Sequence, residues 1–164
     1  ILSIRDNDRR GERRMNDILR EIGSISRMLD AIANIEFKEL KLNKGQYIYL
    51  VRIFENEGII PERLAEVIKV DRTTLSRAVR KLEENGFILK ESDPFNKKIK
   101  HLYTTEKGKH VVQFILRENE YSNKIATTQL SASEIETVSN LLSKIRESIE
   151  SDWAIVKNGG KRDY

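Results

Sequence analysis

The spacing of apolar residues in the middle of the chain predicts three short helices and a β-hairpin. Helices are expected over 43–55, 61–68 and 71–84, because apolar residues recur there every three or four positions. After Gly86 the pattern changes to a strand over 87–91, a polar turn over 92–98 and a second strand over 99–104. This order of elements is typical of a helix-turn-helix followed by a β-hairpin wing, which defines a domain over 43–105.

Local signals support these boundaries. Asn43 is placed to cap the first of the three helices, and Pro61 suits the first position of the second. Asp71 is placed to accept from the free N–H groups of the third helix, and Gly86 supplies a left-handed stop behind it. Thr105 is expected to cap the helix that follows the hairpin.

Two long helices with apolar stripes flank this domain. One is expected from Met15 to about Glu36, and the other follows Ser131, which with Glu134 has the spacing of a capping box. A single subunit would leave part of both stripes in water, so we expect a helical dimerisation module over 15–42 and 106–156. The alternative is that the two stripes cover each other within one subunit. The candidate dimerisation residues are Ile18, Ile22, Ile135, Val138, Leu142, Ile145 and Ile149.

The two ends of the chain carry no such pattern. Residues 1–14 mix Arg with Asp and Glu, which predicts a disordered leader, and residues 157–164 are expected to be a flexible tail. No apolar run near the start is long enough for a signal peptide or a membrane span. We therefore expect a cytoplasmic protein with no membrane partner.

Composition favours a mostly α fold and argues against catalysis. Only 2 Pro and 8 Gly accompany 38% hydrophobic and 34% charged residues. The chain has 0 Cys, which excludes a disulfide, a thiolate metal site and a cysteine redox switch. It also lacks a zinc-protease motif, a phosphate-binding glycine loop and a Gly-flanked serine elbow, so we expect neither an enzyme nor a cofactor.

The 71–84 helix is the candidate recognition helix. Its apolar stripe contains Leu75, Val79 and Leu82, whereas its other side carries arginines and short hydroxyls, which suit phosphate oxygens and base edges. Residues 63–110 hold 12 Lys and Arg against 7 Asp and Glu, while the flanking segments are nearly balanced. The alternative is an ordinary solvated helix face. The candidate DNA-binding residues here are Arg72, Thr73, Thr74, Ser76, Arg77 and Arg80.

The segments LAEVIKVDRTTLSRAVRKLEENGFI and DPFNKKIKHLYTTEKG resemble the MarR family of winged helix-turn-helix regulators, and the likeness extends from Met15 to Trp153. Asn96, Lys97 and Lys98 stand where the family commonly has Asp-Arg-Arg. The resemblance implies that Lys97 takes the role of an arginine that enters the minor groove, although lysine offers no planar fork. It also implies a homodimer that binds an inverted-repeat operator in double-stranded DNA, most often as a repressor.

Family members release DNA when a small molecule, an oxidant or a metal binds. The absence of Cys excludes a thiol sensor, and His101 and His110 are too few for a metal sensor, so no metal site is expected. A small organic effector, or none, remains. The family's effector site implies four lining residues, for which a plain core role is the alternative: Met28, Ile32, Tyr47 and Phe114.

The rival function is a winged-helix adaptor that binds protein rather than DNA. An adaptor tolerates Glu or Leu among Arg72, Ser76 and Arg80, and this arc holds neither residue before Glu83. The sequence therefore favours a DNA-binding regulator.

Overall fold

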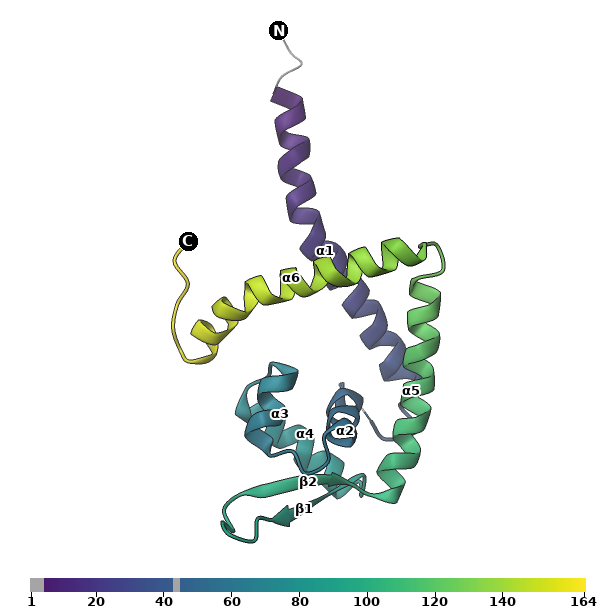
Figure 1. Ribbon diagram of the computed structural model, residues 1–164, viewed down its shortest axis with the longest axis vertical. Helices are drawn as coiled ribbons and strands as arrows, with labels where there is room; N and C mark the ends of the chain where they lie inside the picture. The colour runs from purple at the N-terminus through teal and green to yellow at the C-terminus, as the bar shows by residue number, and fades with distance from the viewer. Residues whose placement is uncertain (1–4, 43–44) are drawn as a thin grey trace.

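The computed structural model describes residues 5–42 and 45–164, with side chains from Ile18 onward. A two-stranded hairpin lies among helices (Figure 1), so the predicted mostly α class with a wing is confirmed. In chain order the elements are α1 (Arg5–Glu36), α2 (Gln46–Glu55), α3 (Pro61–Ile68), α4 (Arg72–Glu84), β1 (Ile88–Ser92), β2 (Lys100–Thr104), α5 (Glu106–Ala126) and α6 (Ala132–Lys157).

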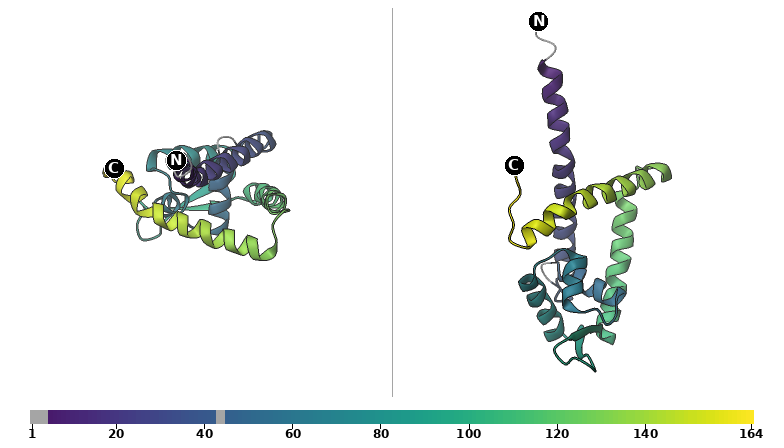
Figure 2. Two further views of the ribbon diagram at one scale, coloured as in Figure 1. Left: turned by 90° about the horizontal axis from the view of Figure 1, so that it is seen from above. Right: turned by 60° about the vertical axis from the view of Figure 1, so that its left-hand side comes forward.

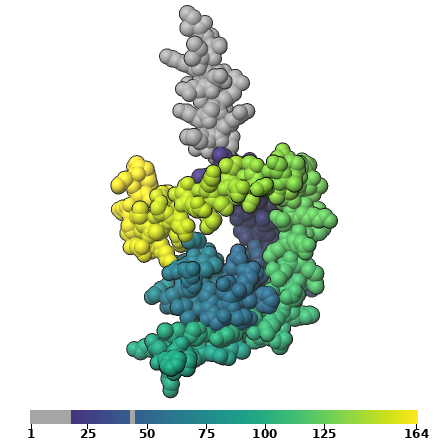
Figure 3. All heavy atoms as spheres, in the orientation of Figure 1, coloured from purple at the N-terminus to yellow at the C-terminus, as the bar shows by residue number. Residues whose placement is uncertain are grey.

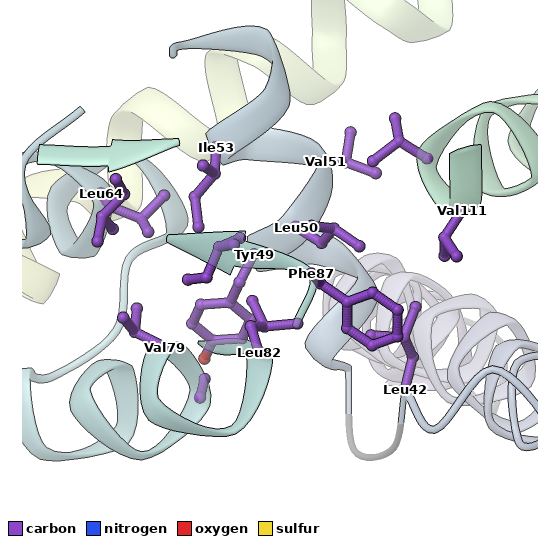
Figure 4. Packing of buried hydrophobic residues seen from close by; sticks show 14 of the residues in the cluster. Leu42, Tyr49, Leu50, Val51, Ile53, Leu64, Val79, Leu82, Phe87 and Val111 are labelled. Atoms are coloured by element: carbon purple, nitrogen blue, oxygen red, sulfur yellow. The ribbon is translucent and has the colours of Figure 1, made fainter. Parts of the chain in front are cut away.

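One apolar core lies between α2, α3, α4, the hairpin and the first half of α5 (Figure 4). Leu50, Ile53, Leu64 and Leu82 are fully buried in it, and Phe87 joins them from the segment between α4 and β1. Burying one such side chain contributes about 1.5–3 kcal/mol. The core therefore fixes α4 against α2 and α3, and it determines which side of α4 faces solvent.

The wing is attached to the loop between α2 and α3. Its two strands are antiparallel, with Ile88 opposite Thr104 and Ser92 opposite Lys100. Leu102 extends the ladder, because its N–H donates to Ile59 O at 3.0 Å and its carbonyl accepts from Gly58 N at 2.8 Å. Buried Thr104 donates both its N–H and its hydroxyl to the Glu57 carboxylate. The hairpin is thus bonded to the helical body along one side.

The three long helices extend away from this body, although Ala33 of α1 and the first half of α5 join its core. Figures 1 and 2 show α5 leading away from the wing, α6 folding back above the body, and α1 projecting past α6. The helices α1 and α6 cross instead of running side by side, and Figure 3 shows an opening between α6 and the body. No residue of α6 is buried, and all of α6 belongs to the described chain. The two stripes therefore do not cover each other within the subunit.

Two predicted starts are wrong. Helix α1 begins at Arg5, so the predicted leader over 1–14 is helical from that residue on, and residues 1–4 lie outside the described chain. Extending an existing helix through Arg and Glu needs no new nucleus. Helix α2 is capped by Gly45, at φ 73°, and not by Asn43, which also lies outside the described residues. A left-handed backbone costs glycine little, so the turn lies there.

The remaining boundaries agree with the predictions to within one residue. The predicted caps Asp71, Thr105 and Ser131 each accept from the backbone of their helix. After Lys157 the chain has no regular structure, and Arg162 pairs with Asp152 at 3.2 Å. Across the part of the chain that the structure describes, the helices are all too short or too polar to cross a bilayer.

Candidate nucleic-acid interface

The start of α4 is held by Asp71. Its Oδ1 accepts from Thr74 N at 2.9 Å, and its Oδ2 accepts from the Thr74 hydroxyl at 2.6 Å. These bonds hold the pKa of the Asp71 carboxyl below its usual value. The predicted DNA contact Thr74 is therefore exposed but has its hydroxyl proton committed to the cap, whereas Thr73 contributes only its backbone to the cap.

The outer face of α4 presents the predicted polar residues to solvent. Leu75, Ala78, Val79 and Leu82 are buried on the opposite face. All of the following are exposed: Arg72, Thr73, Ser76, Arg77 and Arg80. The structure therefore brings together on one surface the residues that the helical period predicts.

The three guanidinium groups of this face are available to a ligand. Arg72 lies 3.7 Å from Glu62, and Arg80 lies 3.7 Å from Glu84, with each arginine side chain more than two-thirds exposed. Exposed pairs of this length contribute little and exchange readily with other anions. The Arg77 side chain makes no hydrogen bond or ion pair within the described residues. Its guanidinium donors are therefore exposed and without a protein partner.

The turn of the wing has a defined backbone. Asp93 Oδ1 accepts from Phe95 N at 2.9 Å and from Asn96 N at 2.8 Å. The Asn96 carbonyl accepts from Ile99 N at 2.8 Å, and its side-chain oxygen accepts from Lys98 N at 3.2 Å. Asn96 therefore shapes the turn, while the neighbouring lysines, Lys97 and Lys98, are exposed as predicted.

His101 connects this turn to the helical body. Its Nδ1 lies 2.7 Å from Gly58 O, and its Nε2 lies 3.0 Å from Asp93 Oδ2. Both bonds form together only when both ring nitrogens carry protons. The Gly58 carbonyl, followed by Asp93, raises the pKa of His101, and the same contact lowers the pKa of Asp93. In the described part of the chain no three His, Asp or Glu side chains converge as metal ligands, and His110 is exposed.

Sequence reasoning missed two lysines beside α4. A hollow of about 320 Å³ lies between the start of α3, α4 and the hairpin, with Arg72, Lys90 and Lys100 in its lining. Lys90 pairs with Glu83 at 2.6 Å, and Lys100 donates to the Ser92 hydroxyl at 2.5 Å. The register of the hairpin brings both lysines to one face. Alternation along each strand was the available signal, but it does not give the register.

The predicted effector residues are only partly brought together. A pocket of about 210 Å³ lies where α1, α2 and α5 meet, and Tyr47 lines it. Met28 and Ile32 are exposed on α1 outside its lining, and Phe114 lies edge-on to Phe37, with 6.1 Å between ring centroids. These three residues therefore do not line this pocket, and their predicted role in effector binding stays a prediction. The lining is Leu29, Ala33, Tyr47, Glu118, Asn119, Ser122, Asn123 and Ala126.

The lining of this pocket includes one acidic side chain, Glu118. Ser122 Oγ donates to Glu118 Oε1 at 2.5 Å. Burial raises the pKa of the Tyr47 hydroxyl, and the charges of Asp30 and Glu118 raise it further. The tyrosine therefore stays neutral, with its hydroxyl hydrogen-bonded to the Asp30 carboxylate and Glu118 nearby.

The predicted dimerisation residues form long, uncovered stripes. Ile22 and Ile145 are half-buried. The other five are exposed, each by between 39% and 50% of its surface: Ile18, Ile135, Val138, Leu142 and Ile149. Leu19, Leu141 and Ile155 extend the same uncovered apolar surface.

The sequence and the structure of this chain are both similar to those of known transcriptional regulators. Residues 42–100 match the MarR family model. The chain is 60% identical to the uncharacterized HTH-type transcriptional regulator YybA of Bacillus subtilis over 150 residues, which are 92% of this chain and all of YybA. It is also similar to two solved structures. A transcriptional regulator SlyA has 56% identity and a TM-score of 0.83, with 85% of this chain and 99% of that one covered.

The second structure is a MarR family transcriptional regulator from Listeria monocytogenes complexed with 26mer DNA. It has 54% identity and a TM-score of 0.86, with 89% of this chain and 97% of that one covered. The 150 residues aligned with YybA include the helix-turn-helix, the wing and most of the terminal helices. The chain belongs to the MarR family of winged helix-turn-helix transcriptional regulators.

Proposed function

We propose that this regulator binds double-stranded DNA in a sequence-specific manner, with α4 in the major groove and the wing beside it. One observation carries the proposal: α4 buries its apolar face and presents Arg72, Arg77 and Arg80 with short hydroxyls on the other. The related Listeria protein, solved with DNA, supports it. An α-helix fits the major groove, where arginine forms two bonds to guanine.

The arginines and lysines have different tasks in this proposal. Arg77 has no protein partner to give up, so it reads a base edge, and Thr73 and Ser76 contact neighbouring bases or phosphates. Lys97 and Lys98 on the wing hold the backbone, and Lys97 reaches into the minor groove. Lys90 and Lys100 add positive charge between helix and wing.

We propose that the working unit is a homodimer formed through α1 and α6. The occupant of the uncovered stripes is a second copy of this chain, because the stripes are apolar and continuous on both terminal helices. Two α4 helices then meet half-sites of an inverted repeat about 34–36 Å apart. A dimer that covers a promoter in this way acts as a repressor, in the cytoplasm, where the DNA lies.

Sedimentation of the protein at micromolar concentration tests the dimer. We expect a dimer for the unmodified chain and weaker association for Leu142→Glu, because the substitution places a charge within the apolar seam. Leu142→Met is the matched control, since it keeps the apolar character and the approximate volume of the side chain. A folded monomer that binds full operator as tightly as a half-site would refute this part of the proposal.

A small organic effector fits the pocket between α1, α2 and α5. Asp30 and Glu118 beside Tyr47 disfavour an organic anion and favour an organic cation that pairs with these carboxylates. Thermal unfolding with benzylamine and with benzoate compares the two charges on one ring. We expect benzylamine alone to raise the melting temperature, and a larger rise with benzoate would contradict the assignment.

The DNA proposal is tested on a duplex selected by the full chain from a randomised library. Arg77→Ala is expected to cost ~1–3 kcal/mol in binding and to relax preference at one position of each half-site. Lys98→Ala is expected to weaken binding to the selected duplex and to a scrambled duplex by similar factors. The slope of log binding constant against log salt concentration should fall by about 1 for each phosphate that the variant no longer neutralises. If both variants leave slope and specificity unchanged, the adaptor alternative replaces this proposal.

A further inference from the structure

Phe95 is almost entirely surrounded by water, unlike the other phenylalanines of this chain. Its surface is 97% exposed, whereas Phe37 and Phe87 are buried, Phe54 packs against the core and Phe114 lies against the Phe37 ring. Single exposed apolar residues are common, so exposure alone indicates nothing. The backbone and the charges around Phe95 indicate a binding role for its ring.

The backbone under Phe95 is held in place. Its N–H donates to Asp93 Oδ1 at 2.9 Å, and the other oxygen of that carboxylate lies 3.0 Å from His101 Nε2. His101 in turn contacts the Gly58 carbonyl of the helical body at 2.7 Å. A ring presented on a preformed turn loses little conformational entropy when it is bound. The structure therefore projects this ring from a fixed backbone at the tip of the wing.

The charges around the ring select the kind of partner. Lys97 and Lys98 follow it closely in the chain, and both are exposed. A surface that pairs an apolar ring with adjacent ammonium groups matches the minor groove, whose phosphates border walls of deoxyribose and base. Apolar side chains in such a groove enter between base steps and partly unstack them.

We propose that Phe95 contacts the minor groove beyond each half-site and wedges against a base step there. The inference rests on the DNA binding proposed above, and it assigns to Phe95 a preference that α4 cannot supply. Pyrimidine–purine steps such as TA and CA unstack easily, so they are favoured at the step that Phe95 meets. Specificity at this position comes from deformability and not from hydrogen bonds.

The experiment uses the full chain and a duplex that it selects from a randomised library. The base 2-aminopurine, whose fluorescence rises when it unstacks, replaces adenine at successive positions outside the half-sites. The variants are Phe95→Ala, Phe95→Leu and, as a matched exposed aromatic far from the wing, Tyr164→Ala. Thermal unfolding verifies that each variant folds.

We expect the unmodified chain and Tyr164→Ala to increase fluorescence at one position on each side of the site. Phe95→Ala is expected to abolish the increase and weaken binding at least about fivefold, with the salt slope unchanged because no charge is removed. Phe95→Leu keeps an apolar side chain, so an intermediate result supports the wedge. Replacing a TA step by AA at the same position should weaken DNA binding by the unmodified chain but not DNA binding by Phe95→Ala.

Two results overturn the inference, and they are distinguishable. If the unmodified chain selects no sequence, the DNA-binding proposal fails and the inference fails with it. If the unmodified chain selects a duplex and Phe95→Ala gives the same affinity and the same fluorescence, the DNA-binding proposal stands. The proposed insertion of Phe95 at a base step is then wrong. In that case the exposed ring serves another partner, such as an acidic protein surface.

Discussion

Gly108 occupies the closest approach between α5 and the segment that enters the wing, which makes Gly108→Ala a sharp test of the fold. A Cβ added at this glycine would lie 2.1 Å from Phe87 O and 3.0 Å from the Phe87 carbonyl carbon. Ordinary contact between nonbonded heavy atoms needs well over 3 Å. The obstacle is backbone, so no side-chain rotation relieves it, and α5 must move away by about 1 Å.

The expected cost follows from what that movement breaks. Phe87 O accepts from Thr105 N at 3.0 Å and from the Thr105 hydroxyl at 3.2 Å. The bond from Thr105 N would exceed hydrogen-bond length, at about 0.5–1.5 kcal/mol. The single proton of the Thr105 hydroxyl lies closer to Gly86 O, at 2.7 Å, so its contact with Phe87 O adds little. Overpacking adds about 1–3 kcal/mol, and the helix propensity of Ala returns about 0.5–1 kcal/mol. The net prediction is a loss of about 0.5–4 kcal/mol in the free energy of unfolding, with the middle of this range at about 2 kcal/mol.

Urea unfolding at one fixed protein concentration measures this loss, since dimer stability depends on concentration. Gln113→Ala introduces the same residue at an exposed position of the same helix and is expected to stay within about 0.5 kcal/mol of the unmodified protein. A Gly108→Ala protein as stable as that control would show that α5 does not lie against Phe87, and the placement of the wing on α5 would be refuted.

Two further predictions concern the wing and the turn before α4. The pKa of His101 is raised and that of Asp93 lowered, so their contact is complete below the ordinary imidazole pKa of about 6.5 and above the ordinary carboxyl pKa of about 3.9. The stabilisation from this contact is lost as pH rises through the raised pKa of His101. The melting temperature of the unmodified protein should therefore fall more steeply with pH in this range than that of His101→Gln. Equal slopes for the two proteins would exclude a contribution of the His101–Asp93 contact to stability. Lys69 has a left-handed backbone at φ 62°, and its ion pair with Glu150 joins two half-exposed side chains. Lys69→Gly should therefore be about 1 kcal/mol more stable than Lys69→Ala, and equal denaturation midpoints would show that the turn is unstrained.

The fold of α4 could be predicted because every signal for it is local. Asp71 and Gly86 mark its ends within the helix's own neighbourhood, and the period of 3.6 residues gives its two faces. The start of α1 could not be predicted in this way. Its first turns carry no apolar period, and they are helical by extension of the helix that follows.

The pocket between α1, α2 and α5 shows what a family resemblance leaves open. Met28 and Ile32 are exposed, while Leu29 and Ala33, one position further along α1, line this pocket. One residue turns a helix by about 100°, so a resemblance that gives the helix does not give the side chains that face a pocket. The contact of His101 with Gly58 joins residues 43 positions apart, and no local pattern indicates it.

The contacts of the wing also limit how an effector can act. Glu57 holds Thr104, Gly58 holds His101, and Gly108 packs on Phe87, so the loop after α2, the hairpin and the start of α5 are joined at three places. The proposed effector pocket lies further along the same α5, where this helix meets α1 and α2. A ligand there meets α5 as a continuous rod of 21 residues that begins at the wing. In the proposed mechanism, release from DNA therefore requires the body and wing to move together relative to the terminal helices. This movement changes the distance between the two α4 helices of a dimer. It leaves the structure of each winged helix-turn-helix domain unchanged.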